Sequence, residues 1–277
     1  MSASAHAGVR PAAVAGLFYP EEAVFLKKEV CRFLAMGKAA LSQNDVFSDK
    51  GSHHLRCLIV PHAGYMYSGK TAGRAYAELA RLEQKPRRVI LLGPAHRVYV
   101  PFISVADVAA YQTPLGLAPV AEATHELAER FGFVPEVHRQ EHALEVQLPF
   151  LQTVLPNGEY IPIVVGGADP RQLADVLRPY LDDETLLLVS TDLSHFLTDA
   201  QARQVDQLSS RCIAELDVQG FMQRGDACGK IGVLTAMILA QARQWSSYCL
   251  DYTNSSEASG DRDRVVGYGA YAMGETK

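Results

Sequence analysis

The stretch LIVPHAGY (residues 58–65) shows a pattern that recurs along the chain: a short apolar run leads into a turn that carries a histidine. The same pattern occurs in VILLGPAHR (residues 89–97) and in LLLVSTDLSH (residues 186–195). A further apolar run, YIPIVV, occupies residues 160–165. Short apolar runs without alternation are typical of strands that are buried on both faces. These runs therefore predict the central strands of a mostly parallel sheet.

Segments with helical spacing of apolar residues lie between several of these runs. They are residues 71–83, 121–131, 143–155 and 171–181, with further helices expected at 20–36, 198–217 and 232–244 and a last strand at 264–273. Strands that alternate with helices favour an α/β fold, with a mostly parallel central sheet and helices on both faces. No repeat or linker divides the chain, so residues 1–277 are expected to form one domain, with residues 1–9 as a flexible N-terminus.

The composition excludes several classes of protein. Of 277 residues, 48% are hydrophobic and 21% are charged, and the net charge is −5, which gives no strong field for nucleic acid or an acidic membrane surface. No apolar run approaches the ~20 residues that cross a bilayer, and no secretory signal opens the chain. The five cysteines are scattered and odd in number, which favours free thiols in a reducing compartment. We expect a cytoplasmic protein that binds neither nucleic acid nor membranes.

Three histidines, His62, His96 and His195, follow strands of the predicted sheet. The carboxyl ends of parallel strands meet at one edge, where open α/β sheets bind their ligands. A single histidine after a strand is more often structural, but three at equivalent positions favour a shared site. Imidazole is the commonest metal ligand and also the commonest acid–base group. From these residues alone, metal binding and acid–base catalysis both remain open.

Asp192 lies three residues before His195. If a helix begins here, this spacing puts both side chains on one face, and the carboxylate would orient the imidazole and raise its basicity. The alternative is a helix N-cap at Thr191 or Asp192, with His195 incidental.

Cys228 directly precedes the apolar helical segment 231–240. A thiol at a helix N-terminus and near Lys230 is favoured as the thiolate, which binds metals or attacks electrophiles. A small packing residue fits the position equally well, and spacing along the chain does not place Cys228 beside the histidines. The other cysteines are expected to pack within apolar or helical stretches; they are Cys31, Cys57, Cys212 and Cys249.

Two more segments carry candidate pocket residues. On a helix, Glu141 and Glu145 would share a face and His142 could pair with Glu145, either supporting the site or contacting a substrate. A polar helix face over buried leucines explains them as well. Residues 252–256 could line a pocket or form a turn-rich hairpin. The expected pocket residues are Tyr65, His142, Glu145 and Ser255. Since no phosphate-binding glycine motif or nucleophile elbow follows a strand, no nucleotide cofactor is expected.

The same motifs, in the same order, resemble the Memo family, called AmmeMemoRadiSam system protein B in bacteria. The matching stretches are residues 10–20, 61–69, 93–96, 141–149, 190–195, 228–229 and 252–256. That family is similar in fold to class III extradiol dioxygenases, which hold non-haem iron at the edge of an α/β sheet. The resemblance implies that His62, His96 and Cys228 are metal ligands and that His195 takes the place of the dioxygenase acid–base histidine.

The resemblance also implies one metal ion, iron or copper with zinc as an alternative, and redox behaviour on an unknown small-molecule substrate. In the dioxygenases the third ligand is a carboxylate, and here a cysteine stands in its place. The softer thiolate favours copper(I), zinc or thiolate-ligated iron. The bacterial name implies a gene neighbourhood, and hence a shared pathway, with an AMMECR-type protein and a radical SAM enzyme.

Three functions compete on this basis. The leading hypothesis is a metal-dependent oxidoreductase in which His195 transfers protons and Asp192 orients His195. The second is a non-catalytic metal- or ligand-binding module that acts through partner proteins. The third is a metal-free hydrolase or transferase with Cys228 as nucleophile and His195 as base.

Overall fold

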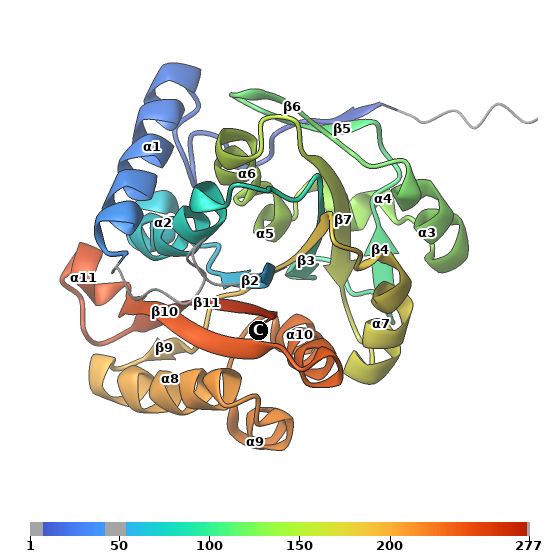
Figure 1. Ribbon diagram of the computed structural model, residues 1–277. Coiled ribbons are helices and arrows are strands. Elements are labelled where there is room, and N and C mark those ends of the chain that lie inside the picture. The colour runs from blue at the N-terminus through green and yellow to red at the C-terminus, as the bar shows by residue number, and fades with distance from the viewer. Residues whose placement is uncertain (1–7, 42–53, 276–277) are drawn as a thin grey trace, which may run out of the picture.

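The computed structural model describes residues 8–41 and 54–275 (Figure 1). Most of the predicted flexible N-terminus, residues 1–7, lies outside the described residues. Val9 opens strand β1 (Val9–Arg10).

The central sheet has, within the described residues, the strand order β10-β11-β2-β8-β3-β7-β4, with β9 beside β11. At its centre, β2 (His54–Val60), β8 (Thr185–Ser190), β3 (Arg88–Pro94) and β7 (Glu159–Val165) are parallel. These are the four predicted runs, so the parallel core is confirmed. The flanking strands pair antiparallel and make the whole sheet mixed; they are β10 (Ser246–Asn254), β11 (Val265–Glu275), β9 (His195–Leu197) and β4 (Ile103–Val105).

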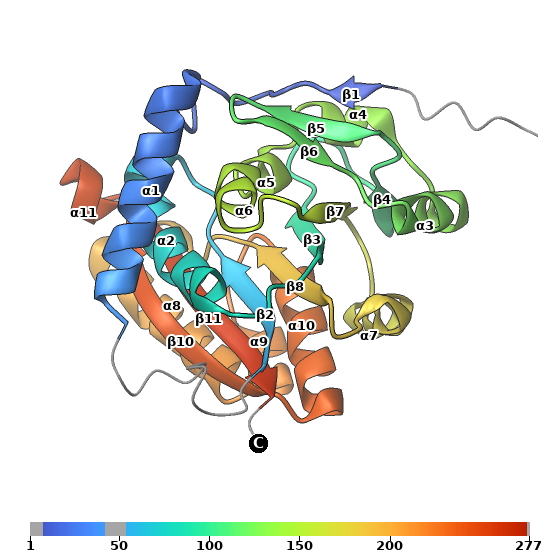
Figure 2. The same ribbon diagram turned by 45° about the horizontal axis from the view of Figure 1, so that its top comes forward.

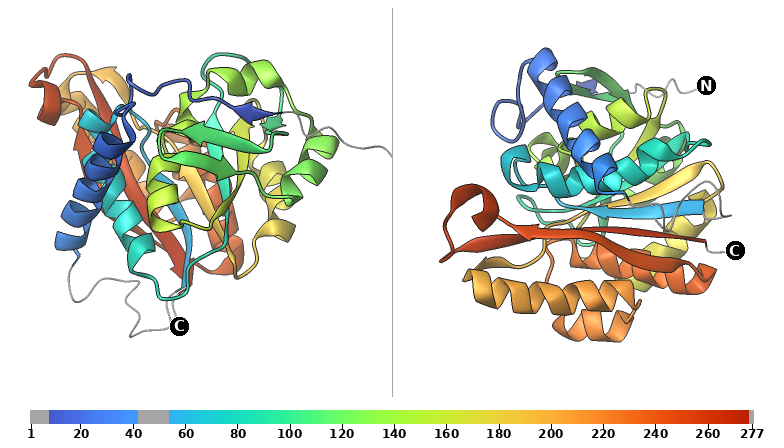
Figure 3. Two further views of the ribbon diagram at one scale, coloured as in Figure 1. Left: turned by 90° about the horizontal axis from the view of Figure 1, so that it is seen from above. Right: turned by 60° about the vertical axis from the view of Figure 1, so that its left-hand side comes forward.

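Helices cover both faces of this sheet (Figure 3). One layer contains α1 (Ala23–Ala39), α2 (Tyr65–Arg81), α5 (His142–Glu145) and α6 (Leu148–Val154); the other contains α7 (Pro170–Leu177), α8 (Asp199–Ala214), α9 (Val218–Arg224) and α10 (Lys230–Arg243). In β3, Val89 and Leu91 pack toward the first layer, and Ile90 and Leu92 toward the second. Because both faces are buried, each central strand contains an unbroken apolar run. The predicted α/β fold is confirmed.

A small second sheet joins the start of the chain to this core (Figure 2). It has the order β1-β5-β6, with β5 at Ala110–Thr113 and β6 at Gly116–Pro119. Short helices complete the fold; they are α3 (Ala123–Phe131), α4 (Pro135–Arg139) and α11 (Ser256–Ser259). Within the described ranges, no helix is both long and apolar enough to cross a membrane.

The predicted helix over residues 143–155 is two helices, α5 and α6, because of Pro149. A proline inside a helix lacks the N–H for the bond to the residue four positions earlier, and its ring collides with that carbonyl. Here that residue is Glu145, and α5 ends there. Pro149 is instead accommodated in the first turn of α6, where prolines are tolerated.

His138 is a buried histidine beside the small sheet. Its Nδ1 lies 2.9 Å from the Tyr111 hydroxyl and its Nε2 lies 3.0 Å from the Ser104 hydroxyl. Burial, followed by the charge of Arg10, lowers the pKa of His138 to about 4. The folded protein therefore holds this side chain neutral, while the unfolded chain binds a proton near pH ~6.5.

Acidification from about pH 7.5 to about 5.5 should lower the free energy of unfolding, with His138 contributing about 1 kcal/mol of the loss. Between the two pKa values the unfolded state binds more protons than the folded state, so stability falls as the pH falls. Urea unfolding of the wild type and of His138→Gln measures the effect. The variant should be less stable at the higher pH but should lose about 1 kcal/mol less on acidification. Equal losses in both proteins would contradict this assignment.

Candidate metal centre

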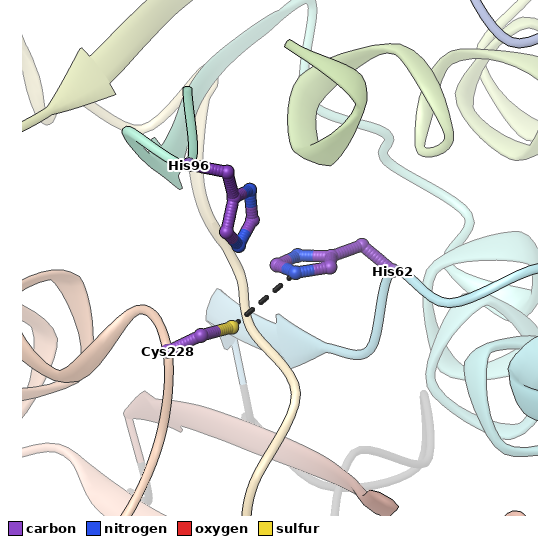
Figure 4. Close-up of side chains that lie close together, drawn as sticks. All are labelled: His62, His96 and Cys228. Atoms are coloured by element: carbon purple, nitrogen blue, oxygen red, sulfur yellow. Dashed lines mark hydrogen bonds between the residues drawn. The ribbon is translucent and has the colours of Figure 1, made fainter. Parts of the chain in front are cut away.

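His62, His96 and Cys228 meet at the carboxyl edge of the sheet (Figure 4). The two histidines follow β2 and β3, and Cys228 lies just before α10. Nε2 of His62 lies 3.3 Å from Sγ of Cys228, and one ligand atom from each residue lies within 4.8 Å of the others. A nitrogen and a sulfur bound to one zinc ion, at about 2.0 and 2.3 Å from the metal, stand about 3.5 Å apart at the tetrahedral angle. The spacing suits a single metal ion.

The orientation of His62 is fixed by the hydroxyl of Ser190. This hydroxyl donates to the carbonyl oxygen of Ala143 at 2.6 Å and accepts from Nε2 of Gln147 at 2.8 Å. Its only hydrogen is therefore used, so Nδ1 of His62, at 2.9 Å, is the donor in their contact. The other nitrogen, Nε2, then carries the lone pair and faces the cysteine sulfur.

His96 is held in the same way by Glu141, the N-cap of α5. One carboxylate oxygen accepts from Nδ1 of His96 at 2.8 Å, and the other accepts from its backbone N–H at 2.8 Å. Burial opposes a charged imidazole, but contacts with Cys228 and Glu141 outweigh it and raise the pKa of His96. Burial also opposes the carboxylate, and the hydrogen bond and charge of His96 nevertheless lower the pKa of Glu141. Nε2 of His96 is left to face the site, and metal binding there must displace its proton.

Asp192 supports two of the three candidate ligands. Its Oδ1 accepts from the backbone N–H of His62 at 2.8 Å, and its Oδ2 lies 4.0 Å from His62 Nε2. Its own backbone N–H donates to Sγ of Cys228 at 3.2 Å, and the Cys228 N–H donates back to the Asp192 carbonyl oxygen at 3.2 Å. The backbone of Asp192 thus holds the Cys228 sulfur in place.

The segment between Asp192 and His195 is not helical, so the shared helix face expected for them is not formed. His195 opens β9, where it pairs with Val266 of β11, and its ring lies 5.7 Å from that of Phe196. Among the hydrogen bonds of the described residues, none joins His195 to Asp192. Asp192 therefore contacts His62 and Cys228, whereas His195 lies on β9.

Glu145 is a buried carboxylate that binds the N-terminal segment of the chain. Its carboxylate pairs with the guanidinium of Arg10 and accepts from the backbone N–H groups of Ala13 and Val14. It also accepts the Tyr19 hydroxyl at 2.5 Å. The carboxylate thus ties the start of the chain to α5, and it does not pair with the neighbouring histidine.

Tyr65 and Ser255 also make structural contacts. The buried Tyr65 hydroxyl donates to the carbonyl oxygen of Val146 at 2.8 Å, and the Ser255 hydroxyl accepts from the Val266 N–H at 3.1 Å. In the described part of the chain, neither side chain makes a hydrogen bond or a ring contact with His62, His96 or Cys228.

Of the four expected pocket residues, only His142 contacts the cluster. Its ring stacks on that of His96 at 4.7 Å and lies edge-on to that of His62 at 5.3 Å. Burial, followed by the nearby His62, lowers the pKa of His142. A neutral third imidazole therefore stands beside the two candidate ligands.

From the sequence, Glu141 could support the site or contact a substrate, and Ser190 was not identified as a site residue. Glu141 supports the site, because it caps α5 and binds His96. Ser190 is the last residue of β8, one of the strands that reach the site. Its position at a strand end was the signal that could have identified it.

The fold and this cluster define an α/β protein with a candidate single-ion metal centre. Residues 10–272 match the family model described as "Memo-like protein", and the chain belongs to this family. It is 32% identical to a MEMO1 family protein of Metallosphaera sedula, over 94% of this chain and 97% of that one. A MEMO1 family protein of Aquifex aeolicus is 31% identical over 94% and 97% of the two chains. The likeness to extradiol dioxygenases stays a prediction.

Replacing Glu141 with Gln should weaken Zn²⁺ binding about 10- to 100-fold, the usual effect of removing the partner that orients a metal-binding histidine. The amide cannot accept from both the ring and the backbone N–H of His96. Competition titration with a chromogenic chelator measures the affinity. Glu136→Gln is the matched control, because Glu136 is exposed and pairs with Arg139. Unchanged affinity in Glu141→Gln would show that His96 needs no such support.

Proposed function

We propose that this Memo-family protein is a metal-dependent redox enzyme that binds one iron or copper ion through His62, His96 and Cys228. The observation that carries the proposal is the orientation of the two imidazoles. Ser190 and Glu141 occupy the Nδ1 atoms of the two histidines, so both Nε2 atoms are directed toward one sulfur. Such outer contacts orient histidine ligands in metal sites generally.

The chemistry of the donors supports the choice of metal. Two imidazoles and a soft thiolate suit copper, iron or zinc, and not magnesium or calcium, which take oxygen ligands. The bound metal would supply one-electron chemistry if it is iron or copper. The Asp192 carboxylate beside His62 adds negative charge that favours a cation. Zinc would fit the same donors without redox activity.

We assign proton transfer to His195, which is partly exposed on β9. The contacts of Asp192 support His62 and Cys228 instead, so His195 would act without that carboxylate as its orienting partner. The protein would work in the cytoplasm, where a thiolate ligand stays reduced. A pathway shared with AMMECR-type and radical SAM proteins belongs to the same proposal, and the small-molecule substrate is unknown.

Elemental analysis of protein purified anaerobically should give about one iron or copper ion per chain. The metal should be lost from His62→Ala and from Cys228→Ser, since each removes one of three ligands. Cys31→Ser is the control, because Cys31 is an exposed cysteine on α1. Unchanged metal in His62→Ala would refute the proposed site. Full metal without reaction with ascorbate or dioxygen would favour the non-catalytic binding module.

His195→Gln should keep the metal but slow oxygen consumption with ascorbate as electron donor by about 100-fold or more, the usual contribution of a general acid or base. Metal content, measured on the same samples, is the control. Equal rates in the variant and the wild type would remove His195 from the reaction and leave the metal site itself untouched.

A further inference from the structure

A cavity of about 320 Å³ adjoins the cluster of His62, His96 and Cys228. The ends of β3, β7 and β8 form one side of it, and the first turn of α10 forms another. Cys228 lines the cavity, whereas the histidines of the cluster do not. Cys228 therefore contacts the imidazoles and also lines the cavity. In open α/β sheets this edge is the usual place for ligands.

The cavity is lined mainly by apolar groups. Leu92, Val165 and Val189 line it from the strands, and Ile231 lines it from α10. Of the described side chains that line it, none is acidic.

Two polar side chains that line the cavity have partners of their own. The Ser190 hydroxyl has its three partners, and the Lys230 ammonium donates to the carbonyl oxygen of Gly225 at 2.8 Å. A charged ligand would lose much of its hydration against the apolar side chains of the strands, which is unfavourable.

Gly166 and Gly167, which line the cavity, are held in place by backbone contacts. The N–H of Gly166 donates to Phe102 and that of Gly167 donates to Val100, both at 2.9 Å. A Cβ on Gly166 would lie 2.0 Å from the Val100 carbonyl oxygen, so the two segments pack as closely as glycine allows. Tyr99, which is 78% exposed, lines the cavity from this loop. This side of the cavity is therefore preformed, as ligand pockets usually are.

We propose that this cavity is the substrate pocket and takes an uncharged, compact, largely apolar molecule, with one end against Cys228. An engineered apolar cavity of about 150 Å³ holds benzene, so about twice that volume fits two fused rings or about ten carbon atoms. Its role as a substrate pocket rests on the proposed function, but binding itself does not require the metal.

Calorimetry with 1-naphthol and 1-naphthoate on the metal-free protein tests the proposal. The two probes share a fused ring system and differ in charge near neutral pH. Naphthol should bind, and naphthoate should bind at least about tenfold more weakly. Ile231→Trp should fill the cavity and weaken naphthol binding at least about tenfold, whereas Ile231→Val should stay within about threefold of the wild type. Circular dichroism checks that both variants fold.

A second readout places the probe. Naphthol should slow alkylation of Cys228 by iodoacetamide, followed by peptide mass spectrometry, and should leave the exposed Cys31 unchanged. Equal binding of naphthoate, full binding to Ile231→Trp, or no protection of Cys228 would each overturn the proposal. The two proposals fail separately. Protection of Cys228 in a protein that takes up no metal would refute only the redox function, and a metal-loaded protein without naphthol binding would refute only the pocket.

Discussion

The candidate site depends on the parallel register of β2 and β8, which sets Val60 opposite Ser190. Because of this pairing, the turn that carries His62 leaves the sheet beside the serine whose hydroxyl binds its ring. A shift of one residue would turn Ser190 toward the opposite layer of helices. The contacts of Ser190 with Ala143 and Gln147 would be lost together, and with them the orientation of the ligand. The apolar packing of the strands therefore also sets the geometry of the polar site.

The short helix α5 connects this geometry to the start of the chain. Glu141 and Glu145 are both buried carboxylates, and each would be costly without partners. Glu141 finds its partner in His96, and Glu145 finds its partners in Arg10 and in backbone N–H groups of the N-terminal segment. Arg10, which is distant from His96 in the sequence, thus helps hold the helix whose cap orients that candidate ligand.

The central strands could be predicted because burial on both faces leaves an unmistakable apolar run. Strand β10 was not predicted because, among the described strands, it pairs with β11 alone, and it mixes polar and apolar residues without a regular alternation. The convergence of His62 and His96 followed from the rule for strand ends. Cys228 could not be placed from spacing, since contacts between segments so far apart depend on the whole fold. The expected Asp192–His195 pair assumed a helix that the chain does not form.

The geometry around Cys228 favours a metal ligand over a nucleophilic cysteine. A thiol nucleophile needs one base, and a single imidazole at hydrogen-bond distance would serve. Here His62 and His96 both direct Nε2 toward the same sulfur, and each is held there by its own buried partner. A second oriented imidazole adds little to a nucleophile, whereas a metal ion needs at least three ligands. The proposed metal therefore explains why the buried Ser190 and Glu141 orient both rings. The apolar cavity beside the sulfur leaves room for a molecule to reach Cys228.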